Sequence, residues 1–486
     1  MGRVTGVRMS ATTVGRGGAP RTARQAISDF AAASPSRFAI IVFALLIALW
    51  TTILALPVST ADGRGTPFAD ALFTAVSVVC VTGLATVDMT THWSGFGEVV
   101  IYVGVQIGGI GVLTLASTLG LIISRHLGLR AKLIAAGDTN PLRTHRGPVP
   151  EGQAVRLGEV GGLLRTIAIS VVVIEALCAA ILFPLMLAHG FAVADAARDA
   201  LYYSAMAFTN TGFAPNNNGL IPFSHDYVFL TTVGVTVMLG AIGFPVIHAL
   251  SRVIRNPAQR RRIVSLHVKL TLVGFGALFA LGGVLYWLLE HANPATFGKL
   301  GGGDAVYQSF FLSAMARSGG FSTFDIADLH NSSLLVTDML MFIGGGSAST
   351  AGGIKVTTLA ILFLAAIAEA KGVESMEAFR RRIPTDVLRV AVSVVLWGAT
   401  IVAVASVTVL AITGESLDHV LFDVISAFAT CGLSTGLTMG APDSVVYILS
   451  LTMFLGRIGS ITLAAALAQS QHRRLYAFPE ERPIVG

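Results

Sequence analysis

Four short elements of this sequence have the composition of turns that could coordinate a cation through their backbone. Each follows an apolar stretch and has glycine as its third residue. Glycine adopts left-handed backbone conformations that other residues avoid, so it allows successive carbonyl oxygens to face one axis. Carbonyls can replace the hydration shell of a cation without a fixed negative charge, so the ion can leave again. The elements are Val81-Thr82-Gly83-Leu84, Asn210-Thr211-Gly212-Phe213, Ser318-Gly319-Gly320-Phe321 and Thr430-Cys431-Gly432-Leu433.

A second glycine cluster follows each element after a similar number of residues, which predicts four copies of one structural unit. A single such turn is most simply explained as a helix-breaking glycine between packed helices. Four turns in matching context favour a shared polar axis, that is, a pore with four-fold pseudosymmetry. The clusters are Gly-Gly-Ile-Gly at 108–111, Gly-Ala-Ile-Gly at 240–243, Gly-Gly-Gly-Ser at 344–347 and Gly-Arg-Ile-Gly at 456–459.

The composition is that of a membrane protein. Of the 486 residues, 53% are hydrophobic and only 12% are charged, and the mean hydropathy is +0.73. A spanning helix needs about 20 mostly apolar residues, whereas shorter apolar helices are typical of re-entrant segments. We therefore expect an all-α polytopic fold with eight transmembrane helices. Four pseudo-repeats, each a spanning helix (M1), a half-helix (P) with its turn and a second spanning helix (M2), would surround one central pore. The predicted spanning helices are 38–58, 96–124, 163–188, 227–250, 268–289, 335–368, 387–413 and 444–470, and the half-helices are 67–80, 195–208, 303–316 and 417–429.

Charge placement predicts the orientation. Most of the 33 lysines and arginines lie in the two terminal segments and in the connections between repeats, and cytoplasmic loops carry such an excess. Both termini are therefore expected in the cytoplasm and the four turns toward the outside. The run at 260–262 supports this orientation, and nucleic-acid binding is disfavoured. The predicted division is 1–37 (disordered cytosolic leader), 38–124, 163–250, 268–369 and 387–470 (repeats one to four), and 471–486 (cytosolic tail).

Two carboxylates lie at corresponding places after the turns. Asp88 and Asp325 each come five residues after their glycine, whereas Leu437 breaks the pattern in the fourth repeat. Acids at the outer mouth, or vestibule, would concentrate cations, but the same residues also cap turns. The sequence leaves both interpretations open.

The repeated pattern resembles the Trk/Ktr/HKT superfamily of potassium transporters, over roughly residues 38–486. Only one spanning helix precedes the first turn, so the chain is similar to the Ktr branch and its ion-conducting subunit, KtrB. The resemblance implies K⁺ as the transported ion, with Na⁺ assistance left open, and no organic cofactor. It also implies a bacterial cell membrane, a homodimer and a cytosolic nucleotide-binding ring of KtrA-like RCK subunits. The potassium filter would consist of Val81, Thr82, Gly83, Asn210, Thr211, Gly212, Ser318, Gly319, Gly320, Thr430, Cys431 and Gly432.

The M2 segment of the third repeat is interrupted by five glycines, three hydroxyl residues and a lysine between 341 and 355. Unpaired backbone groups cannot face lipid, so this stretch must line a cavity. It does not match the phosphate-binding pattern GxxxxGK[ST]. By resemblance it is an intramembrane gating loop, 344–353, beneath the filter and opposite Arg457. The predicted gate comprises Gly344, Gly345, Gly346, Ser347, Ser349, Thr350, Gly352, Gly353, Lys355 and Arg457.

Two charged residues of the spanning segments have more than one interpretation, and a third is assigned no role. Arg457 would be a positive barrier in the pore, or a structural partner of a backbone carbonyl. Lys355 belongs to the gate or extends toward the cytoplasmic side. Glu175 has no partner that the sequence identifies.

The predicted function is therefore K⁺ uptake through a gated filter. A less selective Na⁺/K⁺ transporter and a secondary carrier with inverted repeats are the alternatives, although four repeats of one orientation disfavour the carrier. A membrane enzyme is disfavoured because the 11 histidines show no ligand spacing such as HExxH.

Overall fold

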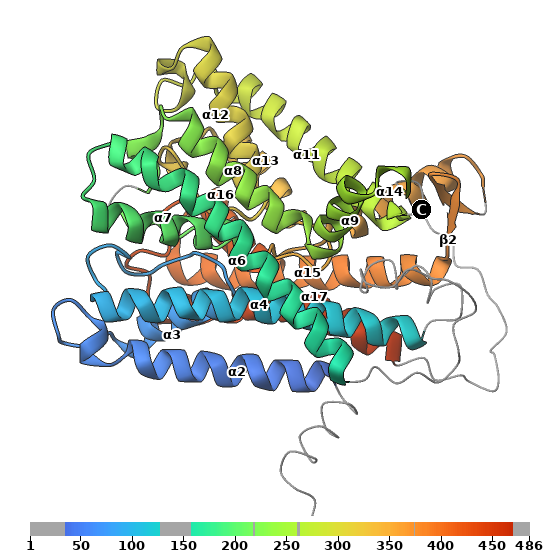
Figure 1. Ribbon diagram of the computed structural model, residues 1–486, viewed down its shortest axis with the longest axis horizontal. Coiled ribbons are helices and arrows are strands. Elements are labelled where there is room, and N and C mark those ends of the chain that lie inside the picture. The colour runs from blue at the N-terminus through green and yellow to red at the C-terminus, as the bar shows by residue number, and fades with distance from the viewer. Residues whose placement is uncertain (1–34, 127–156, 217–218, 260–262, 374, 470–486) are drawn as a thin grey trace, which may run out of the picture.

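The computed structural model describes residues 35–126, 157–216, 219–259, 263–373 and 375–469 (Figure 1). Most of the predicted leader, the tail 471–486 and the basic run 260–262 lie outside the described residues. Within these ranges the fold is helical apart from one antiparallel hairpin of β1 (Met376–Ala378) and β2 (Arg381–Ile383). The chain is an all-α polytopic membrane protein, as predicted.

Six long helices coincide with predicted spanning segments. By length and composition, three described helices could cross a membrane, Ile167–Ala188, Leu266–Glu290 and Thr385–Thr413, and one bent pair would make a fourth. The total of eight spanning helices therefore stays a prediction. The long helices are α2 (Pro35–Leu54), α4 (Gly95–His126), α6 (Leu157–Ala188), α11 (Leu266–Glu290), α15 (Thr385–Thr413) and α17 (Asp443–Gln469).

Four shorter helices lie where half-helices are predicted, and each is followed, after at most two residues, by one of the glycine elements. Each also has an aspartate in its first turn, where a carboxylate interacts favourably with the helix N-terminus. Their residues are largely buried. They are α3 (Phe68–Val79), α7 (Val193–Phe208), α12 (Gly302–Met315) and α16 (Leu417–Ala429).

The helices form a closed ring. Helix α4 contacts α6, α8 (Tyr227–Ile242) contacts α12 and α11, and α14 (Val356–Ala370) contacts α15. The ring closes because α17, near the end of the chain, packs against α2 and α3 near its beginning. The half-helices α3 and α7 lie at the left of Figure 1, whereas α14 and the hairpin lie at the right. Helices α3 and α7 and the hairpin thus lie toward opposite ends of the molecule.

Two helices of the ring are interrupted. The predicted segment 335–368 consists of α13 (Asn331–Phe342) and α14, separated by the loop 343–355, as the glycines indicate. The segment 227–250, predicted as one continuous helix, is instead two helices, α8 (Tyr227–Ile242) and α9 (Phe244–Arg255), at 106° to one another. Gly243 has a φ of 98°, and Pro245 has no N–H to bond the carbonyl of Ala241, so the helix cannot continue.

Short 3₁₀ helices complete the fold: η1 (Pro57–Ser59), η2 (Ile221–Phe223), η3 (Pro257–Gln259), η4 (Phe297–Lys299) and η5 (Ile326–Asp328).

Candidate functional site

The four glycine elements share one backbone conformation. In each, the first residue and the glycine have positive φ angles, and the residue between them does not. Positive φ at a non-glycine residue is strained and persists where the surrounding structure enforces it. The same strain at four corresponding positions indicates one repeated functional geometry. The φ angles are 57° and 91° at Val81 and Gly83, 60° and 83° at Asn210 and Gly212, 79° and 73° at Ser318 and Gly320, and 47° and 95° at Thr430 and Gly432.

The four glycines meet at one point. A methyl group on Gly212 would lie 2.6 Å from the Cα of Gly320, and one on Gly432 would lie 3.2 Å from that same Cα. A methyl group on Gly83 would overlap the carbonyl oxygen of Thr211. No side chain fits at these positions, because the other elements already occupy the space. Elements more than a hundred residues apart in the sequence are therefore brought together around a shared axis.

Carbonyl oxygens are among the atoms nearest this meeting point, and they come from the middle residue of every element. A methyl group on Gly432 would lie 2.6 Å from the Thr82 oxygen, one on Gly320 would lie 2.8 Å from the Cys431 oxygen, and one on Gly212 would lie 2.9 Å from the Gly319 oxygen. The Thr211 oxygen completes the set. We call these four atoms the carbonyl ring. A ring of backbone oxygens is the ligand set that replaces the hydration shell of a monovalent cation.

Serine residues of two half-helices hold their elements in place. Ser77 accepts hydrogen bonds from the N–H of Thr82 at its backbone oxygen (2.7 Å) and from the N–H of Gly83 at its hydroxyl (3.0 Å). Ser426 does the same for Cys431 (2.9 Å) and Gly432 (3.2 Å). These bonds hold two successive amide groups of each of these elements against its half-helix.

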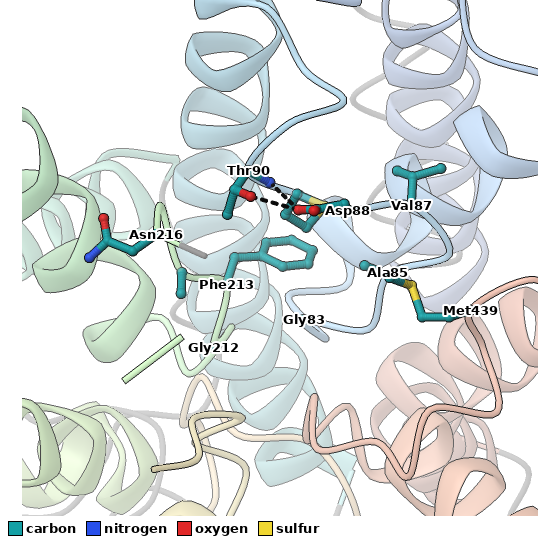
Figure 2. Close-up of a pocket in the computed structure, with 11 residues that line it drawn as sticks. Gly83, Ala85, Val87, Asp88, Thr90, Gly212, Phe213, Asn216 and Met439 are labelled. Atoms are coloured by element: carbon teal, nitrogen blue, oxygen red, sulfur yellow. Dashed lines mark hydrogen bonds between the residues drawn. The ribbon is translucent and has the colours of Figure 1, made fainter. Parts of the chain in front are cut away.

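An open cavity of about 610 Å³ lies next to the first and second elements. Figure 2 shows Gly83, Gly212, Phe213 and Asp88 around it. The Oδ1 atom of Asp88 accepts hydrogen bonds from the N–H (2.8 Å) and hydroxyl (2.7 Å) of Thr90. These bonds lower the pKa of Asp88 below its usual value, so its carboxylate is ionised at neutral pH. Asp88 therefore both lines the cavity and caps a turn.

Asp325 has a different environment. Its carboxylate accepts a hydrogen bond from the N–H of Ala327 (3.0 Å) at the start of η5. It does not line the cavity that contains Asp88. The geometry favours the turn-capping interpretation for this residue.

The loop 343–355 contacts three of the four elements. The hydroxyl of Thr350 donates to the side-chain oxygen of Asn210 (2.6 Å), and the N–H of Gly352 donates to the hydroxyl of Ser318 (3.3 Å). A methyl group on Gly352 would collide with Thr430 and Ala429. The loop is thus packed directly against the elements that form the carbonyl ring.

Arg457 connects this loop to the fourth element. Its side chain is 3% exposed. One guanidinium nitrogen, Nη1, donates to the carbonyl of Thr350 (2.5 Å) and to the hydroxyl of Thr430 (3.3 Å). The Nε and Nη2 atoms have no hydrogen-bond partner among the described residues. A buried, incompletely paired guanidinium, a costly group inside a membrane protein, therefore lies beside the loop and the fourth element.

The ammonium group of Lys355 donates a hydrogen bond to the carbonyl of Ala351 (2.7 Å) within the same loop. This contact favours the gate interpretation of Lys355 over an extended side chain that reaches the cytoplasmic surface. Glu175, whose partner the sequence did not identify, accepts a hydrogen bond from Gln106 of α4 (2.7 Å).

The broken helix α8–α9 also contacts the loop. Its carbonyls at Ala241 and Gly240 accept hydrogen bonds from the N–H groups of Gly346 (2.8 Å) and Thr350 (3.3 Å). The loop thereby satisfies backbone groups that the break in the helix leaves without their helical partners.

Comparison with known proteins agrees with a site that coordinates cations. The family model described as cation transport protein, TrkH, matches residues 12–473. The chain belongs to the TrkH family. It is therefore a transporter and not an enzyme. The Ktr system potassium uptake protein D of Bacillus subtilis is 32% identical over 457 residues, which cover 94% of this chain and 98% of that protein.

Two further relatives extend the comparison. The potassium/sodium uptake protein NtpJ of Enterococcus hirae is 29% identical over 463 residues and covers 91% of this chain and 95% of its own. The crystal structure of the potassium transporter TrkH from Vibrio parahaemolyticus has a TM-score of 0.67 at 19% identity, covering 88% and 83% of the two chains. At this identity the match shows that the fold is shared.

Sequence reasoning missed some residues of this TrkH-family site. Arg317 was not singled out from the sequence, yet it is completely buried beside the third element. Its position directly between a half-helix and a glycine element was the available signal. Ser77 and Ser426 were also missed, although both precede their glycine by the same number of residues.

Proposed function

We propose that this chain takes up K⁺ across the bacterial cell membrane through one pore per chain, whose selectivity filter consists of the four glycine elements. The carbonyl ring of Thr82, Thr211, Gly319 and Cys431 carries the proposal. Four main-chain oxygens around one axis suit a weakly hydrated monovalent cation, which they hold without trapping it. The potassium uptake activity in the name of the Bacillus relative agrees with this ligand set.

The loop 343–355 is the proposed gate, with gate residues within 344–355 and Arg457. The position of the loop supports this role. The loop bonds the second and third elements directly and the fourth element through Arg457. An ion leaving the ring toward the loop would meet its backbone and the guanidinium of Arg457. Displacement of the loop would open the path.

The assembly and orientation belong to the same proposal. Both termini are cytoplasmic, and two chains pair in the membrane beneath a cytosolic RCK ring that binds a nucleotide. The basic connections between repeats are the proposed cytoplasmic surface.

A less selective Na⁺/K⁺ pore is the second candidate. The potassium/sodium uptake activity in the name of the Enterococcus relative favours it. Backbone carbonyls coordinate both ions, and the number and flexibility of the carbonyls determine the preference. K⁺ uptake assisted by Na⁺ is a third candidate activity of the same pore.

Ion flux into proteoliposomes tests the proposal. Uptake of K⁺, Rb⁺ and Na⁺ is measured in parallel for the wild type, Gly83→Ser, Gly320→Ser and the control Gly276→Ser. A methyl group on Gly276 meets no atom within 4 Å, so this control adds the same hydroxymethyl group in open space. We expect the K⁺/Na⁺ ratio to fall in both filter variants and to stay at the wild-type value in the control. Equal ratios in all four proteins would refute the filter assignment.

A further inference from the structure

Arg317 is a buried cation that the filter and the gate as proposed do not use. It is 0% exposed and stands directly before the third element. Its Nη2 donates to the carbonyl of Gly344 (2.9 Å) and its Nη1 to the carbonyl of Phe275 (3.4 Å). Its guanidinium carbon lies 4.3 Å from the centre of the Phe275 ring. No carboxylate of the described residues forms a salt bridge with it.

A guanidinium in this environment is costly to bury. Burying a charge without a counter-ion is unfavourable unless hydrogen bonds and aromatic faces compensate for the lost water. Two carbonyls and one ring are the only compensation seen among the described residues, and Nε has no partner there. A neutral side chain of similar volume would fill the same space without this desolvation cost. We therefore infer that the charge has a role beyond packing.

The two ends of the gating loop are both attached to the third element. Arg317 bonds Gly344 at the start of the loop, and the adjacent Ser318 accepts the N–H of Gly352 near its end. Ser318 also donates to the carbonyl of Thr430 in the fourth element (2.8 Å). Two consecutive residues thus hold the loop at both ends and connect it to two elements of the filter.

We propose that Arg317 is a positioning residue that holds the gating loop beneath the filter and couples its position to that of the third element. This inference rests on the proposed function. The planar guanidinium bonds the carbonyls of Gly344 and Phe275 through two separate nitrogens held in a fixed fork, whereas a lysine ammonium offers a single nitrogen on a flexible stem. Since Arg317 and Ser318 are consecutive, a shift of the third element on ion binding moves both attachments of the loop. Coupling of this kind is reciprocal, so displacement of the loop also alters the affinity of the filter for ions, to the same extent for K⁺ and Na⁺.

The test measures basal Rb⁺ flux into proteoliposomes without any partner protein, together with the K⁺/Na⁺ ratio. The variants are Arg317→Gln, Arg317→Lys and Phe275→Leu, which removes the aromatic face but keeps the backbone carbonyl. Arg64→Gln is the control, because that arginine is exposed and pairs only with Asp62 at 4.0 Å. Each variant is also made in a chain lacking residues 345–352.

We expect basal flux to rise about tenfold in Arg317→Gln, equivalent to about 1.4 kcal/mol in the equilibrium of the loop. Arg317→Lys retains the charge and one hydrogen bond, so its flux should be intermediate, and Phe275→Leu should show a smaller rise. The K⁺/Na⁺ ratio should stay at the wild-type value. In the loop-deleted chain these substitutions should change the flux no further, because the residue acts through the loop.

Three outcomes would overturn the role of Arg317: wild-type basal flux in Arg317→Lys, an equal rise in the loop-deleted chain, or a lowered K⁺/Na⁺ ratio without a change in basal flux. If both arginine variants fail to fold, Phe275→Leu decides, and unchanged flux in it contradicts the proposal. Failure of the proposed function gives a different result. In that case the loop-deleted chain with native Arg317 carries no K⁺.

Discussion

The backbone N–H of Phe244 donates a hydrogen bond to the carbonyl of Ala348, 3.1 Å away. Phe244 begins α9 just after the break in the second repeat, and Ala348 lies in the loop that breaks the third repeat. Each interruption therefore supplies hydrogen-bond partners for the other. Because no water is available inside a bilayer, two broken helices that complete each other are more stable than either alone.

Gly243→Ala tests this contact between the two broken helices. A methyl group there would lie 2.5 Å from the oxygen of Ser347 and 3.3 Å from that of Ala348, and the φ of 98° is unfavourable for alanine. We expect the loop to be displaced, basal Rb⁺ flux to rise severalfold and the melting temperature in detergent to fall.

Gly414→Ala is the matched control for that substitution. Gly414 also has a positive φ, 67°, but a methyl group on it meets no atom within 4 Å. It should lose stability by about 1 kcal/mol from backbone strain alone, with unchanged flux. If the two variants show the same flux, the contact does not control the gate.

Arg457→Ala should raise basal flux. The substitution removes the bonds to Thr350 and Thr430 and a positive charge adjoining the carbonyl ring. A charged hydrogen bond contributes about 1.5–3 kcal/mol, so a change of at least tenfold is expected in proteoliposomes. Arg457→Lys keeps the charge and separates the two effects, because a purely electrostatic barrier would leave its flux at the wild-type level. A lower flux in Arg457→Ala would contradict the assignment.

Asp88→Asn should weaken K⁺ uptake at low ionic strength. The carboxylate lines the open cavity beside the first two elements, which is the outer mouth of the proposed pore, and its attraction for cations is screened by salt. We expect the K⁺ concentration for half-maximal uptake to rise about twofold at low salt and less at high salt. Asp325→Asn, which removes a turn cap outside that cavity, should leave this concentration unchanged.

The lowered pKa of Asp88 predicts how its effect on K⁺ uptake depends on pH. Hydrogen bonds from Thr90 hold the pKa of Asp88 below its ordinary value of 3.8. The charge, and the stability that it contributes to the turn, are present above the unfolded value and are lost as the pH falls through the lowered folded value. The difference in half-maximal uptake between wild type and Asp88→Asn should therefore be constant from neutral pH to about pH 5. A difference that disappears between those values would show that the carboxylate is already protonated there.

Ser77→Ala should lower ion selectivity. It leaves the half-buried N–H of Gly83 without its acceptor, at a cost of about 1 kcal/mol, and loosens the first element of the carbonyl ring. Parallel K⁺ and Na⁺ uptake measures the ratio. Ser309→Ala is the control, because that hydroxyl bonds only the carbonyl of Ala305 within its own half-helix. A ratio that falls equally in both variants would indicate a general loss of packing.

The local elements of the fold could be predicted from the sequence. The half-helix 417–429 was predicted with the bounds that α16 has, and the glycine-rich break in the third repeat lies where its composition indicates. Such features depend on apolar length and on residues whose backbone preferences are strong. The break at Gly243 and Pro245 was also encoded locally. It was predicted as continuous helix because apolar length alone does not distinguish a straight helix from a bent one.

The sequence by itself determined that four equivalent glycine turns exist and that each follows a short apolar helix. Only the tertiary structure decided that the turns meet at one point, that Arg317 and Arg457 bond the loop rather than carboxylates, and that Phe244 bonds Ala348. The reason is physical. Backbone preference is a property of a few neighbouring residues, whereas a buried polar group is satisfied by whichever partner the closed ring of helices places beside it.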